Sequence, residues 1–198
     1  MSFVTQEDVF QAIEPVMRGV FEEFADWDGK GRAFADGPFP RIPFAEAMAK
    51  YGSDKPDLRN PIELKDVTDF FADESKTGFG LFAGIVAGGG KVIAIPAPEA
   101  TTKKSRKFFG EMDKWAKKDM QAGGLGWSRL REAEGGGIDS QDPVLKNFEP
   151  DHLKAMLEHL GLGAGDGVFF SAGKKGAAYK LAGAARNKIG EELDLIES

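Results

Sequence analysis

The sequence contains no cysteine, only two histidines among its 198 residues, and no long apolar run. The absence of cysteine excludes disulfide bonds and thiolate metal sites. A membrane-spanning helix needs roughly 18 to 20 apolar residues in a row, and no segment reaches that length. The N-terminal residues MSFVTQEDVF show no basic stretch followed by an apolar one, so we expect no secretory signal. We therefore expect a soluble, cytoplasmic protein with no membrane partner.

The chain also lacks an excess of positive charge. Its 26 basic and 32 acidic side chains give a net charge of −6, which argues against a protein built mainly to coat nucleic acid. Residues 1–70 carry 8 basic and 14 acidic side chains, residues 71–135 carry 11 and 8, and residues 136–198 carry 7 and 10. The net charges of these parts are therefore −6, +3 and −3. Only the middle part is basic, which hints at an anionic partner there.

The first part of the chain has a helical pattern followed by an unusual charged segment. Apolar residues recur at three- and four-residue steps over about residues 6–25, and the preceding TQED fits a capping box, which predicts a helix. Residues 26–40 are rich in glycine and proline and predict a loop. The residues FAEAMAKY at 44–51 predict a short helix closed by Gly52. The stretch YGSDKPDLRNPIEL at 51–64 then crowds four charges around one proline, with Tyr51 and Leu58 expected to hold it by packing.

From residue 78 onward, short apolar segments alternate with amphipathic ones. We predict strands at residues 79–87, 91–98, 124–132 and 166–173, the first two forming a hairpin. We predict helices at residues 102–121, 143–148, 149–161 and 176–193. This order indicates an α+β fold with a mixed or antiparallel sheet and helices packed on one face. The predicted boundary with the N-terminal helical segment falls near residues 72–78.

Few residues offer independent chemistry. His152 and His159 are seven residues apart on one predicted helix, too far for an i,i+4 metal pair, so we expect no metal site. The glycines of GLGAGDG follow a helix and precede a strand, the reverse of the order in a dinucleotide-binding loop. The segment SAGKKG does join a strand to a helix, so Lys174 and Lys175 either lie near anion-binding amides or belong to a plain turn.

The middle of the chain gathers four basic side chains at Lys103, Lys104, Arg106 and Lys107. They suit contacts with a phosphate backbone, and the alternative is a solvated helix face. Two tryptophans, Trp115 and Trp127, fit either core anchors or platforms on which bases stack. The residue pattern leaves these alternatives open.

The segment FPRIPFAEAMAKYGSDKPDLRNPIEL, with its YGSDKPDLR block, resembles bacterial-type aspartyl-tRNA synthetase where an insertion leaves the class II catalytic domain. MSFVTQEDVF resembles the region after that family's second class-defining motif. SRK at 105–107, GLGW at 124–127, DPVLKNF, DGVFF and LAGAARNKIGEELDL resemble, in order, its insertion, the GAD domain. The segment IPAPEATTKK and the residues Ser171, Ala172 and Gly173, where relatives commonly have Gly-Ala-Asp, depart from the family pattern, so no site is assigned to that turn.

The resemblance implies a parent aspartate–tRNA ligase, a homodimeric class II aminoacyl-tRNA synthetase. Such an enzyme activates aspartate with ATP and Mg²⁺ and transfers it to tRNA. Residues 1–77 would be a partial catalytic-domain segment and residues 78–198 the GAD insertion domain. The motif 2 arginine, the glycine-rich motif 3 and the anticodon-binding barrel do not occur in this sequence. We therefore expect a non-catalytic fragment without a cofactor of its own, whose partner is the rest of the synthetase chain.

The resemblance also suggests roles for the charged residues. Asp54, Lys55, Asp57 and Arg59 would lie at the rim of the active site or face the tRNA. Arg59 either pairs with an aspartate of its own loop or faces the tRNA acceptor end. The four basic residues from Lys103 to Lys107 would contact the tRNA backbone. The alternative is a structural module that buttresses the catalytic domain without touching RNA.

Overall fold

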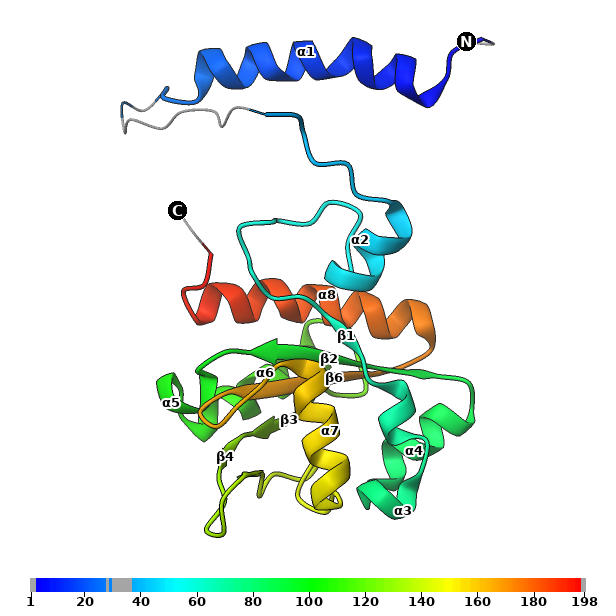
Figure 1. Ribbon diagram of the computed structural model, residues 1–198, viewed down its shortest axis with the longest axis vertical. Helices are drawn as coiled ribbons and strands as arrows, with labels where there is room; N and C mark the ends of the chain where they lie inside the picture. Colours follow the sequence, from blue (N-terminus) through cyan, green and yellow to red (C-terminus); the bar gives the residue numbers. More distant parts are fainter. Residues whose placement is uncertain (1–2, 28, 30–36, 197–198) are drawn as a thin grey trace. The chain divides into compact units, whose positions relative to one another are not determined.

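The computed structural model describes residues 3–27, 29 and 37–196 of the chain (Figure 1). The chain divides into two compact units, Met1–Ile42 and Pro43–Ser198. The domain boundary predicted between residues 77 and 78 lies inside the second unit and remains a prediction. No helix within the described residues is long and apolar enough to cross a membrane.

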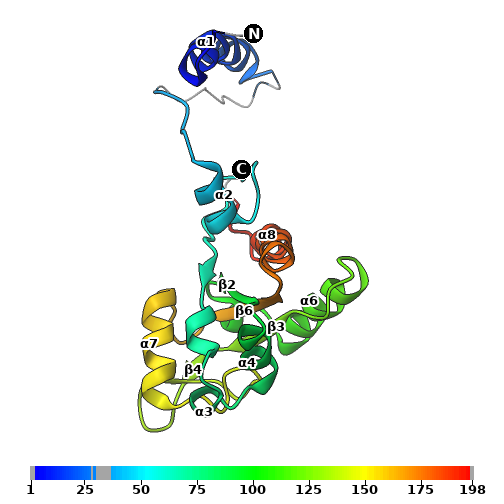
Figure 2. The same ribbon diagram turned by 90° about the vertical axis from the view of Figure 1, so that its right-hand side faces the viewer.

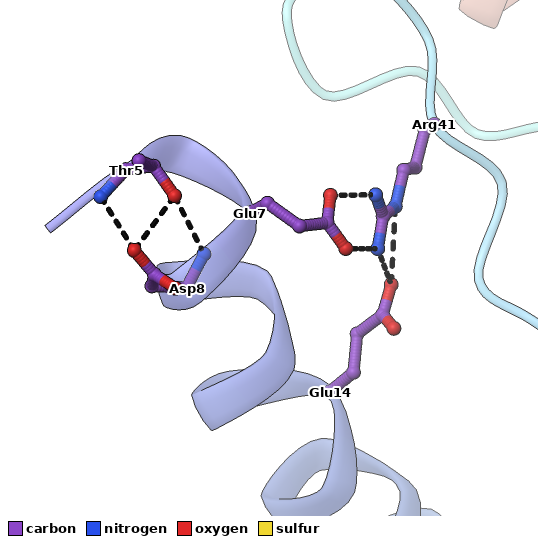
Figure 3. A network of polar contacts seen from close by, with 5 residues as sticks. All are labelled: Thr5, Glu7, Asp8, Glu14 and Arg41. Carbon is purple, nitrogen blue, oxygen red and sulfur yellow. Dashed lines mark hydrogen bonds and ion pairs between the residues drawn. The ribbon is translucent and has the colours of Figure 1, made fainter.

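The first unit is built on helix α1, Gln6–Phe24, which confirms the predicted helix and its capping box. The Asp8 amide donates to the Thr5 hydroxyl oxygen at 3.3 Å, and the Thr5 amide donates to the Asp8 carboxylate at 2.8 Å (Figure 3). Two of the four amides left open at a helix start are thereby satisfied. The predicted loop at 26–40 falls mostly outside the described residues.

Arg41 holds the end of this unit against α1. Its guanidinium donates to Glu7 at 2.6 Å and to Glu14 at 3.3 Å, two carboxylates seven residues apart on one helix face (Figure 3). The same guanidinium lies 4.5 Å from the centre of the Phe10 ring. Hydrogen bonding to Glu7 raises the pKa of Arg41 and lowers the pKa of Glu7.

Most residues of helix α1 are exposed. None of its residues is buried. Its large exposed apolar side chains are Val9, Ile13, Val16, Met17, Val20, Phe21 and Phe24. A contiguous apolar stripe of this kind marks a surface that another protein segment covers.

The second unit contains the remaining elements. Its helices are α2 (Phe44–Tyr51), the 3₁₀ turn η1 (Thr68–Phe71), α3 (Glu74–Thr77), α4 (Gly80–Ala87), α5 (Ala100–Lys103), α6 (Arg106–Lys118), α7 (Pro150–Leu160) and α8 (Lys175–Glu192). Its strands are β1 (Lys65–Asp66), β2 (Lys91–Ala97), β3 (Gly126–Arg129), β4 (Arg131–Glu132), β5 (Ile138–Asp139) and β6 (Gly167–Gly173).

A four-stranded antiparallel sheet with the order β1-β2-β6-β3 forms the centre of this unit, as the described residues show. The long pair β2 and β6 places Ile95 opposite Phe169 and Ala94 opposite Phe170. A separate two-stranded ribbon joins β4 to β5. The α+β class and the antiparallel sheet predicted from the sequence are therefore confirmed.

Helices cover both faces of this sheet, whereas the sequence pattern predicts helices on one face (Figures 1 and 2). Ile93, Ile95 and Phe169 pack with residues of α6 and α8. Val168 and Phe170, on the opposite face, pack with residues of α4 and α7. Because successive side chains of a strand point to opposite faces, a strand buried on both faces is apolar at every position. The unbroken apolar runs of β2 and β6 are the signature of this double burial.

Three further sequence predictions need correction. Residues 80–87 form helix α4, so the predicted strand at 79–87 and its hairpin with residues 91–98 are wrong. A short apolar run fits either structure, and here Phe79, Phe82, Ala83 and Val86 lie at helical spacing. The predicted helix at 102–121 is two helices separated at Lys104 and Ser105. Residues 143–148 form turns.

Candidate functional site

The charged segment 51–62 lies against the C-terminal half of helix α8, and one buried arginine anchors it there. Arg186, only 1% exposed, donates from Nη2 to the carbonyl oxygens of Asn60 at 2.6 Å and Asp57 at 3.0 Å. Its Nε donates to the carbonyl oxygen of Ile62 at 2.6 Å. The guanidinium therefore satisfies three backbone acceptors from a stretch of six residues, which suits its planar fork of donors.

Asn60, 2% exposed, completes this anchor from the other side. Its amide nitrogen donates to the carbonyl oxygen of Arg186 at 3.0 Å, and its side-chain oxygen accepts from the Ile62 amide at 3.1 Å. Arg186 also lies over the Tyr51 ring, 4.9 Å from its centre. Burial lowers the pKa of Arg186, and these acceptors compensate for the loss of water around its charge.

Glycines on α8 make room for the segment. A Cβ on Gly183 would lie 2.6 Å from the carbonyl oxygen of Gly52, which itself adopts a left-handed φ of 67° as the cap of α2. A Cβ on Gly190 would overlap the side-chain amide of Asn60. Gly183 and Gly190 are seven residues apart and share one face of the helix. The blocks YGSDKPDLRN and LAGAARNKIG are thus complementary halves of one packed junction.

The four charges predicted to face a ligand lie on the outside of this junction. Arg59 donates to Asp57 through Nε at 3.0 Å and Nη2 at 2.7 Å, so it pairs with an aspartate of its own loop. These hydrogen bonds lower the pKa of Asp57 to about 2. Lys55, 3.4 Å from Asp54, has a side chain that is 87% exposed. Leu58 is 48% exposed, so the prediction that it pins the loop by packing is wrong, whereas Tyr51 does contribute.

The four residues predicted to contact the tRNA backbone lie near the start of α6, and three of them have acidic neighbours. Lys103 lies 2.8 Å from Glu99, Lys104 lies 3.7 Å from Glu192, and Lys107 lies 3.5 Å from Glu111. Arg106 instead lies 5.8 Å from the centre of the Trp127 ring. Trp115 and Trp127 are both half-buried and pack against the core. Among the described residues, no hydrogen bond or ion pair joins these four cations to the charged residues of segment 54–59.

The other side chains singled out in the sequence have structural surroundings. His152 Nε2 lies 2.7 Å from the carbonyl oxygen of Phe70, and the His159 ring lies 5.7 Å from the Phe70 ring. Lys174 caps α8 and Lys175 begins it. Within the described ranges, no three histidine, aspartate or glutamate side chains are grouped so that they could hold a metal ion.

Sequence reasoning missed the residues that hold the site together, chiefly Arg186 and Asn60. It also missed Asp142, 2% exposed, which accepts from Arg129 Nε at 2.9 Å and Nη2 at 3.0 Å. One signal for Arg186 was present, because it is a single arginine among the small residues of LAGAARNKIG. A long cation between helical glycines and alanines indicates a buried partner rather than a solvated face.

The fold and this junction define an α+β domain, in which an antiparallel sheet lies between helices and a charged segment docks on the last helix. Residues 82–182, just over half of the chain, match the GAD domain family. The chain therefore belongs to the GAD domain family.

Curated relatives resemble the whole chain. Proteins named aspartate–tRNA(Asp/Asn) ligase are 56% identical in Zymomonas mobilis over 197 residues and 57% identical in Erythrobacter litoralis. The relative with the same name in Novosphingobium aromaticivorans is 54% identical. Each alignment covers 100% of this chain, and 31%, 30% and 31% of the three relatives respectively. The chain thus spans about a third of the length of the curated relatives that it matches.

Proposed function

We propose that this chain is part of a cytoplasmic, homodimeric aspartate–tRNA ligase, a class II aminoacyl-tRNA synthetase. The whole enzyme would activate aspartate with ATP and Mg²⁺ and transfer it to tRNA. The observation that carries this proposal is identity above 50% along the full chain to proteins named aspartate–tRNA(Asp/Asn) ligase. Because that name includes both tRNAs, we also propose that the parent charges the asparagine tRNA as well as the aspartate tRNA.

Within that enzyme, this part would be non-catalytic and would join the GAD domain to the catalytic domain. The exposed apolar side chains of α1, such as Val9, Ile13 and Val16, support this arrangement, because the rest of the synthetase chain would pack against them. The docked segment supports it too, since Arg186 ties the backbone that follows α2 to the last helix of the GAD domain.

We propose an accessory role on the tRNA side for the basic residues Lys103, Lys104, Arg106 and Lys107. Their three ion pairs are exposed, and such pairs are worth only about 0 to 1 kcal/mol. Phosphate groups can therefore replace the carboxylate partners at small cost. Lys55, with its exposed ammonium, is the member of the 54–59 group best placed to meet RNA.

The second candidate function is a structural buttress without RNA contact, and specific observations favour it as well. Glu99, Glu111 and Glu192 already accompany three of the four cations. The Arg59 fork is already filled by Asp57. Under this alternative, the charges stabilise the domain and its docked segment only.

The test uses the full-length ligase that contains this chain. Charging of aspartate tRNA with aspartate tests the parent activity, and its absence would refute that activity. Charging of asparagine tRNA with aspartate tests the dual specificity, and its absence would refute only that part. Replacing Lys103, Lys104, Arg106 and Lys107 by alanine should raise KM for tRNA without changing aspartate-dependent ATP–pyrophosphate exchange. A control replaces four exposed lysines elsewhere: Lys76, Lys146, Lys154 and Lys180. An unchanged KM for tRNA in the first variant would favour the buttress. ATP–pyrophosphate exchange by the 198-residue chain alone would refute its non-catalytic role.

A further inference from the structure

A largely apolar groove of about 440 Å³ opens between α4, α6 and the residues that lead into β3. Its walls include Phe82 and Ile85 from α4 and Trp127 from β3, and Asp113 and Lys117 of α6 stand at its edge. The volume falls within the range of small-ligand sites in proteins. This groove is separate from the docked segment 51–62, and it is not lined by Lys103, Lys104, Arg106 or Lys107.

Glycines create the floor of this groove. Gly123, Gly124 and Gly126 line it, and a Cβ added to Gly126 would lie 3.0 Å from the Phe82 ring. Gly123 is exposed, and a Cβ added there would meet nothing within 4 Å. These glycines add no side chains to the groove, so we expect it to admit a flat group beside Trp127.

Trp127 has the surroundings of a stacking platform. It is half-buried, its ring centre lies 5.4 Å from that of Phe109, and it lines the groove. The guanidinium of Arg106 lies 5.8 Å from its centre. In the described part of the chain, Arg106 has no carboxylate partner, so its charge is available at this end of the groove.

The charge beside the groove favours a polyanion. Helix α6 carries five cations and two carboxylates in the sequence RKFFGEMDKWAKK. Asp113 is already used, since it accepts from the Leu125 amide at 2.9 Å and from Lys117 at 2.7 Å. Lys114 and Lys118 are exposed and form no ion pair with any described residue. Asp113 and Lys117 of α6 line the groove, and the exposed Lys114 and Lys118 follow them directly in the same helix.

We propose that this groove binds one base of an unpaired RNA strand, whose neighbouring phosphates lie along α6. Stacking on an aromatic side chain beside a positive track is the general way in which proteins hold single-stranded nucleic acid. The inference rests on the proposed tRNA-side function and names the part of the RNA that is recognised. It extends the contact from Lys103–Lys107 to Lys114 and Lys118, and it assigns Trp127 a role in binding the base.

The test compares an eight-nucleotide oligoadenylate with an abasic strand of the same length and charge, each titrated into the chain at low salt. Oligoadenylate should bind more tightly than the abasic strand. Gly123→Leu adds a large side chain to the lining of the groove and leaves Trp127 in place. It should weaken oligoadenylate binding by about 5- to 100-fold, as expected for the loss of one stacked base. Gly135→Leu is the matched control, because a Cβ there also meets nothing within 4 Å, and it should bind like the unaltered protein.

Fluorescence locates the base. In a Trp27→Phe, Trp115→Phe background, Trp127 is the remaining tryptophan of the three, and oligoadenylate should quench it while the abasic strand should not. Lys114→Ala and Lys118→Ala should each reduce the slope of log K against log salt by about 0.7. They should leave the difference between the two strands unchanged.

The outcomes separate the two proposals. Equal affinity of the unaltered chain for both strands, or no effect of Gly123→Leu, overturns the base site and leaves RNA binding through charge intact. Failure of both strands to bind at low salt overturns the base site together with the tRNA-side role. Charging by the full-length enzyme is measured separately and is not affected by either result.

Discussion

Arg186 and Asn60, 126 residues apart in the sequence, hold each other's backbones. The Arg186 guanidinium donates to the carbonyl oxygen of Asn60 at 2.6 Å, and the Asn60 side-chain amide donates to the carbonyl oxygen of Arg186 at 3.0 Å. Both side chains are almost wholly buried. This reciprocal pair fixes the charged segment to α8, and it accounts for two polar side chains that are almost wholly buried.

Loss of the arginine fork should destabilise the second unit. Arg186→Met would leave the carbonyl oxygens of Asp57, Asn60 and Ile62 without this donor, and we expect a loss of about 3 kcal/mol in the free energy of unfolding. Arg186→Lys should lose nearly as much, because one ammonium group cannot reproduce the planar fork. Denaturant unfolding measures both variants. Arg131→Met, at an exposed position, is the control and should change stability by less than about 0.5 kcal/mol.

The close approach of α8 to the α2 cap should make one glycine intolerant of alanine. In Gly183→Ala, the new methyl group would meet the backbone of Gly52, and overpacking of this kind costs about 1 to 3 kcal/mol. Gly176→Ala is the same substitution in the same helix, at a position where a Cβ meets nothing within 4 Å. It should be neutral or stabilise by up to about 1 kcal/mol through helix propensity. The thermal unfolding midpoint should fall in Gly183→Ala and stay the same or rise in Gly176→Ala, and equal shifts would contradict the packed junction.

Asp57 should report on its ion pair with Arg59. Its pKa is lowered from 3.8 to about 2, chiefly by the hydrogen bonds from Arg59. A lowered pKa in the folded state means that this stabilisation is present above about pH 4 and is lost as the pH falls through about 2. NMR titration of the Asp57 carboxyl carbon should show that midpoint. In Arg59→Gln, the midpoint should rise towards 3.8, and an unchanged midpoint would contradict the pairing.

Removing one partner of the buried pair Arg129 and Asp142 should lower the free energy of unfolding strongly. Asp142 also receives the Arg129 amide at 3.0 Å, so it ties β3 to the turn that follows β5. Asp142→Ala would leave a half-buried guanidinium without its partner, and we expect a loss of about 3 to 5 kcal/mol. Asp139→Ala, close in sequence but more exposed, should lose less than 1 kcal/mol. Chemical unfolding compares the two, and similar losses would contradict the assigned role.

The sequence predicted the elements whose signals are local. The capping box at Thr5 and Asp8, the helix end at Gly52 and the apolar strands β2 and β6 all depend on neighbours within a few residues, and all are confirmed. The sequence of helix α4 does not distinguish a helix from a strand, because all eight of its residues are apolar or glycine and the run carries no clear period. The apolar runs of β2 and β6 indicate burial on both faces of the sheet, but they do not identify the elements that cover each face.

The candidate site was only partly predictable, because its decisive contacts are distant in sequence. The sequence marks the YGSDKPDLR block as unusual, and it allows Arg59 either to pair with an aspartate of its own loop or to face the tRNA. Nothing local to residues 51–62 indicates that Arg186 is their anchor. Likewise, the lysines near residue 105 were visible as a charge cluster, but their partner Glu192 comes from the far end of the chain.

Hydrogen exchange of the unaltered protein tests most directly whether the charged segment is a fixed part of the domain. The Ile62 amide donates to the Asn60 side chain and the Leu64 amide donates to the Lys50 carbonyl oxygen at 2.7 Å, and both residues are buried. We predict that these two amides exchange about as slowly as those of the central strands β2 and β6. Exchange as fast as that of the exposed turn at residues 135–137 would contradict the docking of the segment on α8.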